Sequence, residues 1–333
     1  MVITLEPNGG TPQPPMLVRY GEAPSQQPAD PEKEHFVFKD WFTDEALENP
    51  VNWNLPVYRS TTYYAKWSIS ADYLTEQLRL VKIKSDASTK AVNNCKYLSE
   101  TQMAEYNATI SQAVKDANAG IRNAQSVEEV EAIQQNLDSS LLPTVKEALD
   151  KELTICTDTN KEDIASANYM TENYINTTNG LVDEASEAGH SQIEVATTIS
   201  DIVAAKISCE STIETYKTQT LTFSESKSNA LTELQTFADT NIATIDGLTD
   251  YLSAAERATY KESITKENND GNDKVKNEVD FPAELSPVVS ATEAAITEIA
   301  TNAQNLNQAR GDAITTANAA ASGMIKALSD SSS

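Results

Sequence analysis

The residues of this sequence that could do chemistry are two histidines, three cysteines and a large surplus of carboxylates. His35 and His190 lack metal-ligand spacing, and no cysteine pair lies near either of them. In "KENNDGNDKVKNE", aligning Gly271 with the sixth position of a calcium loop places Lys266 first and Asn277 twelfth, where carboxylates are required. No glycine-rich phosphate loop occurs, and no carboxylate pair stands out as an acid and a base. We therefore predict no catalytic, metal or cofactor site and a protein that is not an enzyme.

Charge and hydropathy restrict the partners that this chain can have. Its 333 residues carry a formal net charge of −25, and the pI is about 4.4. The electric field of so negative a protein repels phosphate groups. We therefore expect neither a nucleic-acid partner nor binding to an anionic membrane surface. No run of about 18 apolar residues occurs, which predicts no membrane insertion. The start "MVITLEPNGGTPQPP" lacks a basic stretch and an apolar core, so we expect no signal peptide.

Cysteine usage indicates a reducing compartment. Cys95, Cys156 and Cys209 are far apart in the sequence, and their number is odd. Because they lack paired spacing, we expect free thiols that serve as small buried apolar residues.

Proline is concentrated near the N-terminus. Nine of the twelve prolines lie between Pro7 and Pro56, and none occurs between Thr144 and Phe281. Because proline removes a donor and clashes inside a helix, the first part of the chain is expected to be non-helical. Residues 1–35, with "PNGGTPQPP" and "PSQQPADPEKE", are too polar to fold alone and are predicted to form an extended Pro-rich arm.

Aromatic residues are concentrated in residues 36–70, which include every tryptophan of the chain. "HFVFKDWF" alternates like a short strand, and "VYRSTTYYAKWSI" is rich in β-branched and aromatic residues. These residues form either a small local core or a docking surface, since tryptophan and tyrosine dominate interface energetics. We predict a small, partly β anchor domain. The residues predicted to bind a partner are Phe36, Phe38, Trp41, Phe42, Trp53, Tyr58 and Trp67.

Beyond residue 70 the apolar spacing changes to that of a helix. The predicted fold class is mainly α, an elongated helical bundle or coiled coil that follows the anchor domain. Helices are predicted over residues 70–100, 100–124, 126–140, 143–176, 191–249, 253–268 and 287–328. Breaks are predicted at "NTTNG" (176–180) and at Gly189. The predicted divisions are a helical module with a first repeat copy (71–180), a long heptad helix (181–250), a second repeat copy (251–286) and an Ala-rich coiled-coil segment with a Ser-rich tail (287–333).

Two stretches place apolar residues at alternating steps of three and four, the heptad pattern of helices that pack along a seam. The first stretch, residues 199–237, has polar seam positions at Lys206, Thr220 and Lys227. The second, residues 289–327, is rich in alanine and needs partner helices, since a single amphipathic helix in water is marginal. The predicted oligomer seam consists of Ile199, Ile202, Ile213, Phe223, Leu234, Phe237, Ile296, Ile299, Leu306 and Met324.

The seams leave two arrangements open. Either helix 287–328 folds back on the helix near 191–249, with Lys206 and Lys227 facing acidic residues there, or copies from several chains coil together. Heptads sustained over about five repeats favour the second arrangement, and we predict a homotrimer. A monomeric antiparallel bundle is the alternative.

The two halves of the helical part each contain a copy of one internal repeat. "YLSETQMAEYNATI" (97–110) and "YLSAAERATYKESI" (251–264) share six of fourteen positions without a gap. Ser99 and Ser253 have the residue type and place of helix N-caps. The repeat predicts a duplicated helical unit.

The first copy resembles the three-helix repeats that are strung in tandem along large Gram-positive cell-wall proteins. The residues that match their pattern are Leu98, Ser99, Ala113, Ala117, Asn118, Ala119, Ile121, Val127, Glu129 and Val130. The resemblance covers about a tenth of the chain, and the second copy departs from it at Pro282 and Pro287. It implies a helical spacer without active-site residues.

The Ala/Thr/Asn/Ser-rich coils from about residue 180 onward are similar to the stalks of bacteriophage head and tail fibres. So is the order of Pro-rich segment, small aromatic domain and helical coil. This resemblance implies a structural virion protein for host attachment, bound to capsid or tail proteins through its N-terminal segment. We expect such a phage fibre or adaptor, made in the host cytoplasm, because the export signal and wall anchor of cell-wall proteins are not seen. The alternative is a helical spacer or binding module of a bacterial cell-surface protein.

Overall fold

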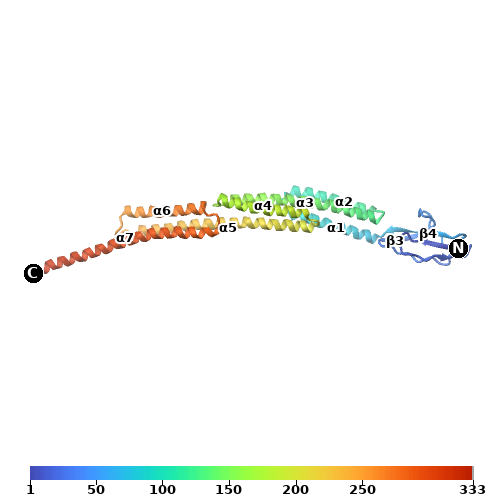
Figure 1. Cartoon of the computed structure of the whole chain (residues 1–333), viewed down its shortest axis with the longest axis horizontal. Coiled ribbons are helices and arrows are strands. Elements are labelled where there is room, and N and C mark those ends of the chain that lie inside the picture. The colour runs from blue at the N-terminus through green and yellow to red at the C-terminus, as the bar shows by residue number, and fades with distance from the viewer. Residues whose placement is uncertain (332–333) are drawn as a thin grey trace. The chain divides into compact units, whose positions relative to one another are not determined.

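A computed structural model describes residues 1–331, and Figure 1 shows the order of their elements. The strands come first: β1 (Val2–Glu6), β2 (Met16–Leu17), β3 (Phe36–Phe42) and β4 (Thr61–Ile69). The helices that follow are α1 (Ala71–Asn93), α2 (Glu100–Asn123), α3 (Val127–Ser166), α4 (Glu172–Val195), α5 (Ile199–Asp246), α6 (Ala254–Asn277) and α7 (Pro282–Ser331). The predicted class, mainly α with a small, partly β N-terminal region, is confirmed.

The chain divides into two compact units. The first unit consists of Met1–Glu152 together with Gln192–Lys206. The second unit consists of Leu153–Ser191 together with the residues from Ile207 on. Helices α3, α4 and α5 each contribute residues to both units, and the boundaries predicted at residues 180 and 250 both lie inside the second unit.

The N-terminal segment belongs to the sheet, so the prediction that residues 1–35 form an extended arm is wrong. The strand order is β2-β1-β4-β3, and β1 pairs in parallel with β4, with Ile3 opposite Thr61. Ile3 and Leu5 are buried while the other residues of β1 are exposed, the alternation of a half-buried strand. The local composition does not indicate that β1 belongs to a sheet, because its partner β4 lies far along the chain.

The turn "PNGG" after β1 is an ordered part of the same domain. The Gly10 N–H donates to the Pro7 carbonyl oxygen (3.0 Å), and the Trp67 indole N–H donates to the same oxygen (2.9 Å). A Cβ on Gly10 would lie 2.5 Å from the Trp67 ring, so the packing leaves no space for a larger residue. The turn therefore ties the first strand to the last one.

The two repeat copies begin equivalent helices. Ser99 caps α2 and Ser253 caps α6, which confirms both predicted N-caps. Each helix has a capping box, completed by Gln102 in the first copy and by Glu256 in the second. The leucine before each cap and the isoleucine that ends each copy are buried in both. The sequence repeat therefore corresponds to a repeated helix start with the same buried positions.

The two predicted breaks, and the gap predicted between helices 126–140 and 143–176, do not interrupt a helix. Pro143 lies inside α3, and both residues 176–180 and Gly189 lie inside α4. In α3, Leu141 and Val145 are buried on either side of the proline. Packing of such an apolar face supplies most of the stability of a protein helix, so it outweighs one lost hydrogen bond.

The predicted helix 191–249, by contrast, is interrupted. α4 ends at Val195, and α5 begins at Ile199 behind Thr198, whose side-chain oxygen accepts from the Asp201 N–H (3.1 Å). The seventh helix also starts earlier than predicted, at Pro282, because proline is tolerated at the first helical position.

The two glycines of α4 provide a matched pair of substitutions. A Cβ on Gly180 would meet no atom within 4 Å, so Gly180→Ala is expected to raise the free energy of unfolding by about 0.5–1 kcal/mol. A Cβ on Gly189 would lie 2.7 Å from Cys209 Sγ and 2.8 Å from Leu153 Cδ2, so Gly189→Ala is expected to lower it by about 1–3 kcal/mol. Urea unfolding followed by far-UV circular dichroism measures both values. Equal effects of the two substitutions would contradict the close packing at Gly189.

In the second unit, α7 packs with α6 and the C-terminal part of α5. Their shared core consists of Ala238, Ile245, Leu252, Ile264, Ile296, Ala300 and Ala303. The fold-back arrangement that the seams left open is therefore present within one chain (Figure 1).

Most predicted seam residues are covered by their own chain. Those that are buried are Ile202, Ile213, Phe223, Leu234 and Ile296. Phe237, Ile299 and Leu306 are partly buried against the shared core of α5, α6 and α7. Ile199 is half-buried, and only Met324 among the predicted seam residues is mainly exposed. The oligomer seam predicted over residues 199–306 is thus an intramolecular one. Helices α3 and α4 contact the middle of α5, and α6 and α7 return along its C-terminal part.

The cysteines are buried and free of disulfides, as predicted. The Cys209 thiol donates to the Ala185 carbonyl oxygen (3.1 Å), and burial raises the pKa of Cys209 to about 11. A thiol with so high a pKa is protonated at neutral pH, so this residue is a packing group rather than a nucleophile.

Candidate partner-binding surface

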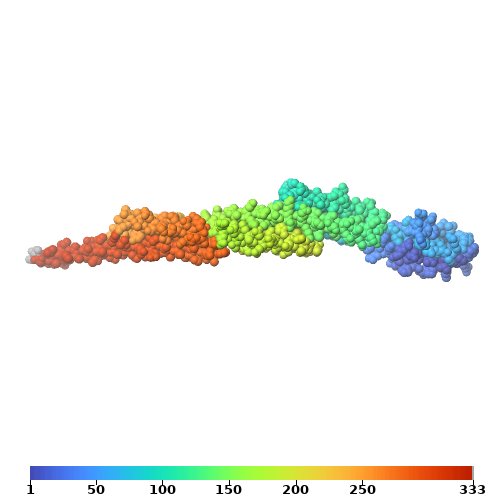
Figure 2. Space-filling model, turned by 45° about the horizontal axis from the view of Figure 1, so that its top comes forward, coloured from blue at the N-terminus to red at the C-terminus, as the bar shows by residue number. Residues whose placement is uncertain are grey.

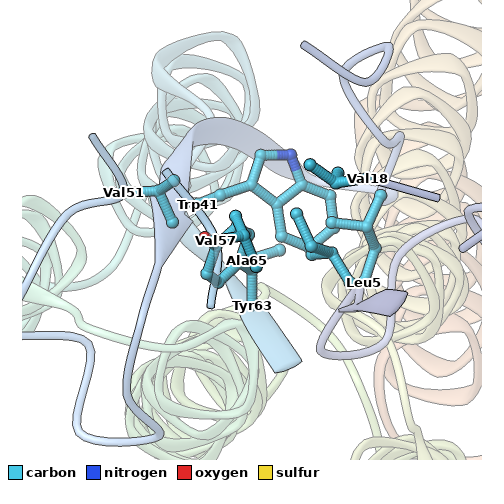
Figure 3. Close-up of a cluster of buried hydrophobic side chains, with 8 residues drawn as sticks. Leu5, Val18, Trp41, Val51, Val57, Tyr63 and Ala65 are labelled. Carbon is cyan, nitrogen blue, oxygen red and sulfur yellow. The ribbon is translucent and has the colours of Figure 1, made fainter. Parts of the chain in front are cut away.

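Most of the aromatic residues predicted to bind a partner lie instead in the core of residues 1–69, which we call the β domain. Trp41 is 2% exposed, and Figure 3 shows its indole ring beside Leu5 and Val18. The aromatic residues that pack against the same cluster are Phe38, Trp53 and Trp67. These side chains therefore form the small local core, which the sequence had left open as one of two alternatives.

Phe36 and Phe42, at the two ends of β3, are partly covered by lysines. Lys33 Nζ lies 4.4 Å from the centre of the Phe36 ring, and Lys66 Nζ lies 4.7 Å from the centre of the Phe42 ring. Phe42 is also buried. These cation–π contacts use the ring faces, so neither phenylalanine presents a bare apolar surface.

Tyr58 is the predicted anchor residue that does stay exposed. Its side chain is 61% exposed and meets the ring of Tyr20 edge-on, with centroids 5.6 Å apart. The isolated bridge between Glu22 and Val57 holds the two segments together. We call Tyr20 and Tyr58 the tyrosine pair. Exposed tyrosines of this kind are frequent anchors of protein interfaces.

Sequence reasoning missed Tyr20 because it assigned the residue to an arm without structure. The signal that could have found it is the period-two alternation of "VITLE", which predicts a strand before the prolines begin. A strand there makes the following segment part of a domain.

The first polar seam position, Lys206, lies in the first unit. Lys206 Nζ is 3.5 Å from Glu152 Oε1, and the two side chains are 7% and 0% exposed. Glu152 also accepts the backbone N–H groups of Lys96, Tyr97 and Leu98, which lie in the loop between α1 and α2. The acidic partner of Lys206 is therefore on α3 and not on the helix predicted over 287–328.

The second polar seam lysine, Lys227, lies in the second unit. Lys227 Nζ donates to the carbonyl oxygen of Tyr169 (2.7 Å), a residue with the left-handed φ of 62°. Burial lowers the pKa of Lys227, and the charges of Asp280 and Glu284 act in the opposite direction. The lysine thereby holds the loop between α3 and α4 in a conformation that non-glycine residues seldom adopt.

The second unit also has a groove of about 550 Å³ between α4, α5 and the start of α7. Its lining includes four aromatic side chains, Tyr174, Tyr216, Phe223 and Phe281. The other lining residues are Thr177, Thr178, Leu181, Thr218, Gln219, Thr222, Ser226 and Pro282. None of these side chains is charged, so the groove suits apolar contact rather than acid–base chemistry.

Within residues 1–331 we find no group of three histidine, cysteine, aspartate or glutamate side chains placed to hold a metal ion. In the same range, the helices all lack the length of apolar sequence that crossing a membrane requires.

Comparison with known families gives a match in the N-terminal part of the chain. Residues 2–66 match the Listeria-Bacteroides repeat domain. This domain is found in bacterial cell-surface proteins. The matched residues run from β1 into β4, so the match coincides with the β domain and leaves the helices outside. No curated protein and no solved structure is significantly similar to the chain.

Proposed function

We propose that this chain is a non-enzymatic structural module of a bacterial cell-surface protein. In this proposal the β domain presents the tyrosine pair to a partner, and the helices serve as a spacer. The observation that carries the proposal is the match of residues 2–66 to a repeat domain of bacterial cell-surface proteins. This observation supports the alternative reading of the sequence better than it supports a phage fibre.

The helical part agrees with a spacer role. Both repeat copies start with a serine cap and a capping box, which are devices of local stability rather than of ligand recognition. The resemblance of residues 98–133 to the three-helix repeats of Gram-positive cell-wall proteins has the same implication. A row of such units separates a binding domain from its attachment point without contributing chemistry.

The location of the protein is the decisive test. Antibodies against the purified chain are applied to intact cells of the organism that encodes it, and in parallel to virions induced from the same culture. We expect labelling of intact cells and its loss after surface proteolysis. Labelling confined to virions would overturn the proposal and restore the phage fibre, and labelling only after cell lysis would overturn both.

A further inference from the structure

The groove between α4, α5 and the start of α7 is lined by threonine hydroxyls that the helices do not use. Of the nine threonines of α5, seven donate their hydroxyl to the carbonyl oxygen four residues earlier, a common bond of threonine in helices. The two others, Thr218 and Thr222, both line the groove, and their hydroxyls bond to no described residue. The hydroxyls that lack an internal partner on α5 are therefore those at the groove.

The wall of the groove that α4 forms has the same property. Thr177 and Thr178 line the groove, and their hydroxyls make no hydrogen bond within residues 1–331. Thr178 is only 7% exposed. A hydroxyl that is buried without a partner costs free energy, which a bound molecule recovers when it forms the missing hydrogen bond.

Two longer polar side chains of α5 complete this set. Tyr216 and Gln219 line the groove, and the phenol hydroxyl and the side-chain amide are also without a partner in the described part of the chain. Hydroxyl and amide groups both donate and accept hydrogen bonds, and at neutral pH they carry no charge. The groove thus offers four threonine hydroxyls, one phenol and one amide to a ligand.

Aromatic rings supply the apolar part of the groove. The rings of Tyr174 and Phe223 lie with their centroids 5.4 Å apart, and the Tyr174 hydroxyl is 3.2 Å from Thr220 Oγ1. Phe281, just before the start of α7, is 48% exposed. The face of an aromatic ring carries partial negative charge, so it attracts C–H groups that neighbouring oxygen atoms polarise.

Hydrogen bonds fix the start of α7 against the start of α4. Asp280 accepts from the Thr171 hydroxyl and from Asn173 Nδ2 (2.7 Å), and these bonds lower the pKa of Asp280. The next residue, Phe281, donates its backbone N–H to Glu284 Oε2 (3.0 Å). Figure 2 shows the yellow-green surface of α4 meeting orange surface at this end. The walls of the groove are therefore held in place by the protein itself.

The lining selects the chemical class of the ligand. An anion would meet no cation there and would be repelled by the net charge of −25, and a cation would meet no carboxylate in the lining. A purely apolar molecule would leave the Thr178 hydroxyl unpaired. A neutral saccharide has polarised C–H groups for the rings and hydroxyls for the polar side chains. The volume of about 550 Å³ is in the usual range of small-molecule sites.

We propose that this groove binds a neutral oligosaccharide. The rings of Tyr216 and Phe281 contact the C–H groups of the sugar. The sugar hydroxyls bond to Thr178, Thr218 and Thr222. This inference goes beyond the proposed function, in which the helices serve as a spacer, and does not depend on it.

Titration of the full chain with cellotetraose, maltotetraose and chitotetraose, followed by ligand-observed NMR, tests the proposal. We expect at least one of these neutral tetrasaccharides to bind, and the charged tetragalacturonate to bind at least about tenfold more weakly. Phe281→Ala removes an exposed ring of the groove and is expected to weaken the association constant by about tenfold or more. The matched control Tyr58→Ala removes an exposed ring of the β domain and is expected to leave it unchanged.

The role of the hydroxyls is tested with Thr222→Val, which keeps the shape of the side chain. It is expected to weaken binding about three- to tenfold, the effect of one lost hydrogen bond. Thr232→Val is the matched control, because Thr232 is also exposed on α5 but lies outside the groove and bonds to the Ser228 carbonyl oxygen. Since Phe281 and both threonines are exposed, the far-UV circular dichroism of every variant should match that of the wild type.

Three results would overturn the proposal. The first is the absence of binding to all three neutral tetrasaccharides at millimolar concentration. The second is binding that both Phe281→Ala and Thr222→Val leave intact. The third is binding of tetragalacturonate as tight as that of the neutral tetrasaccharides.

Discussion

Replacing Glu152 by glutamine is expected to lower the free energy of unfolding of the first unit by about 3–5 kcal/mol. The substitution keeps the shape of the side chain and removes a fully buried carboxylate 3.5 Å from Lys206 Nζ. The amide nitrogen of glutamine cannot accept a hydrogen bond, so at least one of the three backbone N–H groups, of which that of Leu98 is buried, loses its acceptor. Because those groups lie just before Ser99, the start of α2 is expected to loosen first.

Hydrogen exchange across residues 94–100, together with urea unfolding, measures this effect. Glu131→Gln, an exposed glutamate on the same helix α3, is the matched control and is expected to change stability by less than about 0.5 kcal/mol. The double variant Glu152→Gln with Lys206→Met should recover part of the loss, since it removes both buried charges. Unchanged exchange of the 96–98 amides in Glu152→Gln would show that the carboxylate does not hold this loop.

Trp41→Ala is expected to destabilise the β domain by about 3–5 kcal/mol, because it removes the largest side chain from the core beside Leu5 and Val18. Tyr58→Ala is the matched aromatic control. Its ring is 61% exposed, so its removal is expected to cost less than about 0.5 kcal/mol. The contrast separates a core residue from a residue that is free to bind a partner.

The distribution of tryptophan allows unfolding of the β domain to be measured separately from unfolding of the helices. All three tryptophans lie in the β domain, so tryptophan fluorescence during urea unfolding reports on that domain, and far-UV circular dichroism reports on the helices. In Trp41→Ala the fluorescence transition is expected to move to lower urea while the helical transition changes little. If Trp41 were a docking residue, as the sequence suggested, both transitions would match those of the wild type.

The parts of the fold that could be predicted from the sequence are those encoded within a few residues. A serine followed three residues later by glutamine or glutamate marks a helix start at Ser99 and Ser253, and both helices begin there. The change from aromatic, β-branched residues to a helical period near residue 70 marks the end of β4 and the start of α1. These signals need no distant partner, so composition and spacing reveal them.

The pairing of strand β1 and the roles of the aromatic residues could not be predicted in this way. β1 is stabilised by parallel pairing with β4, and the proline-rich segment between β1 and β3 takes its order from that pairing and from the contact of Gly10 with Trp67. An aromatic-rich segment serves equally well as a core or as a docking surface. Only the position of each ring relative to the sheet decided that Trp41 is buried and Tyr58 is exposed.

The sequence by itself determined that α5 and α7 carry apolar stripes at heptad spacing, because a stripe is a property of one helix. The tertiary structure alone decided what covers each stripe. The turns after α5 and α6 bring α6 and α7 back along α5, so Ile245, Ile264 and Ile296 share one core, whereas Met324 lies past the last covering contact. The physical reason is that burying an apolar stripe against any matching surface lowers the free energy of the protein. The connections between helices decide whether that surface belongs to the same chain.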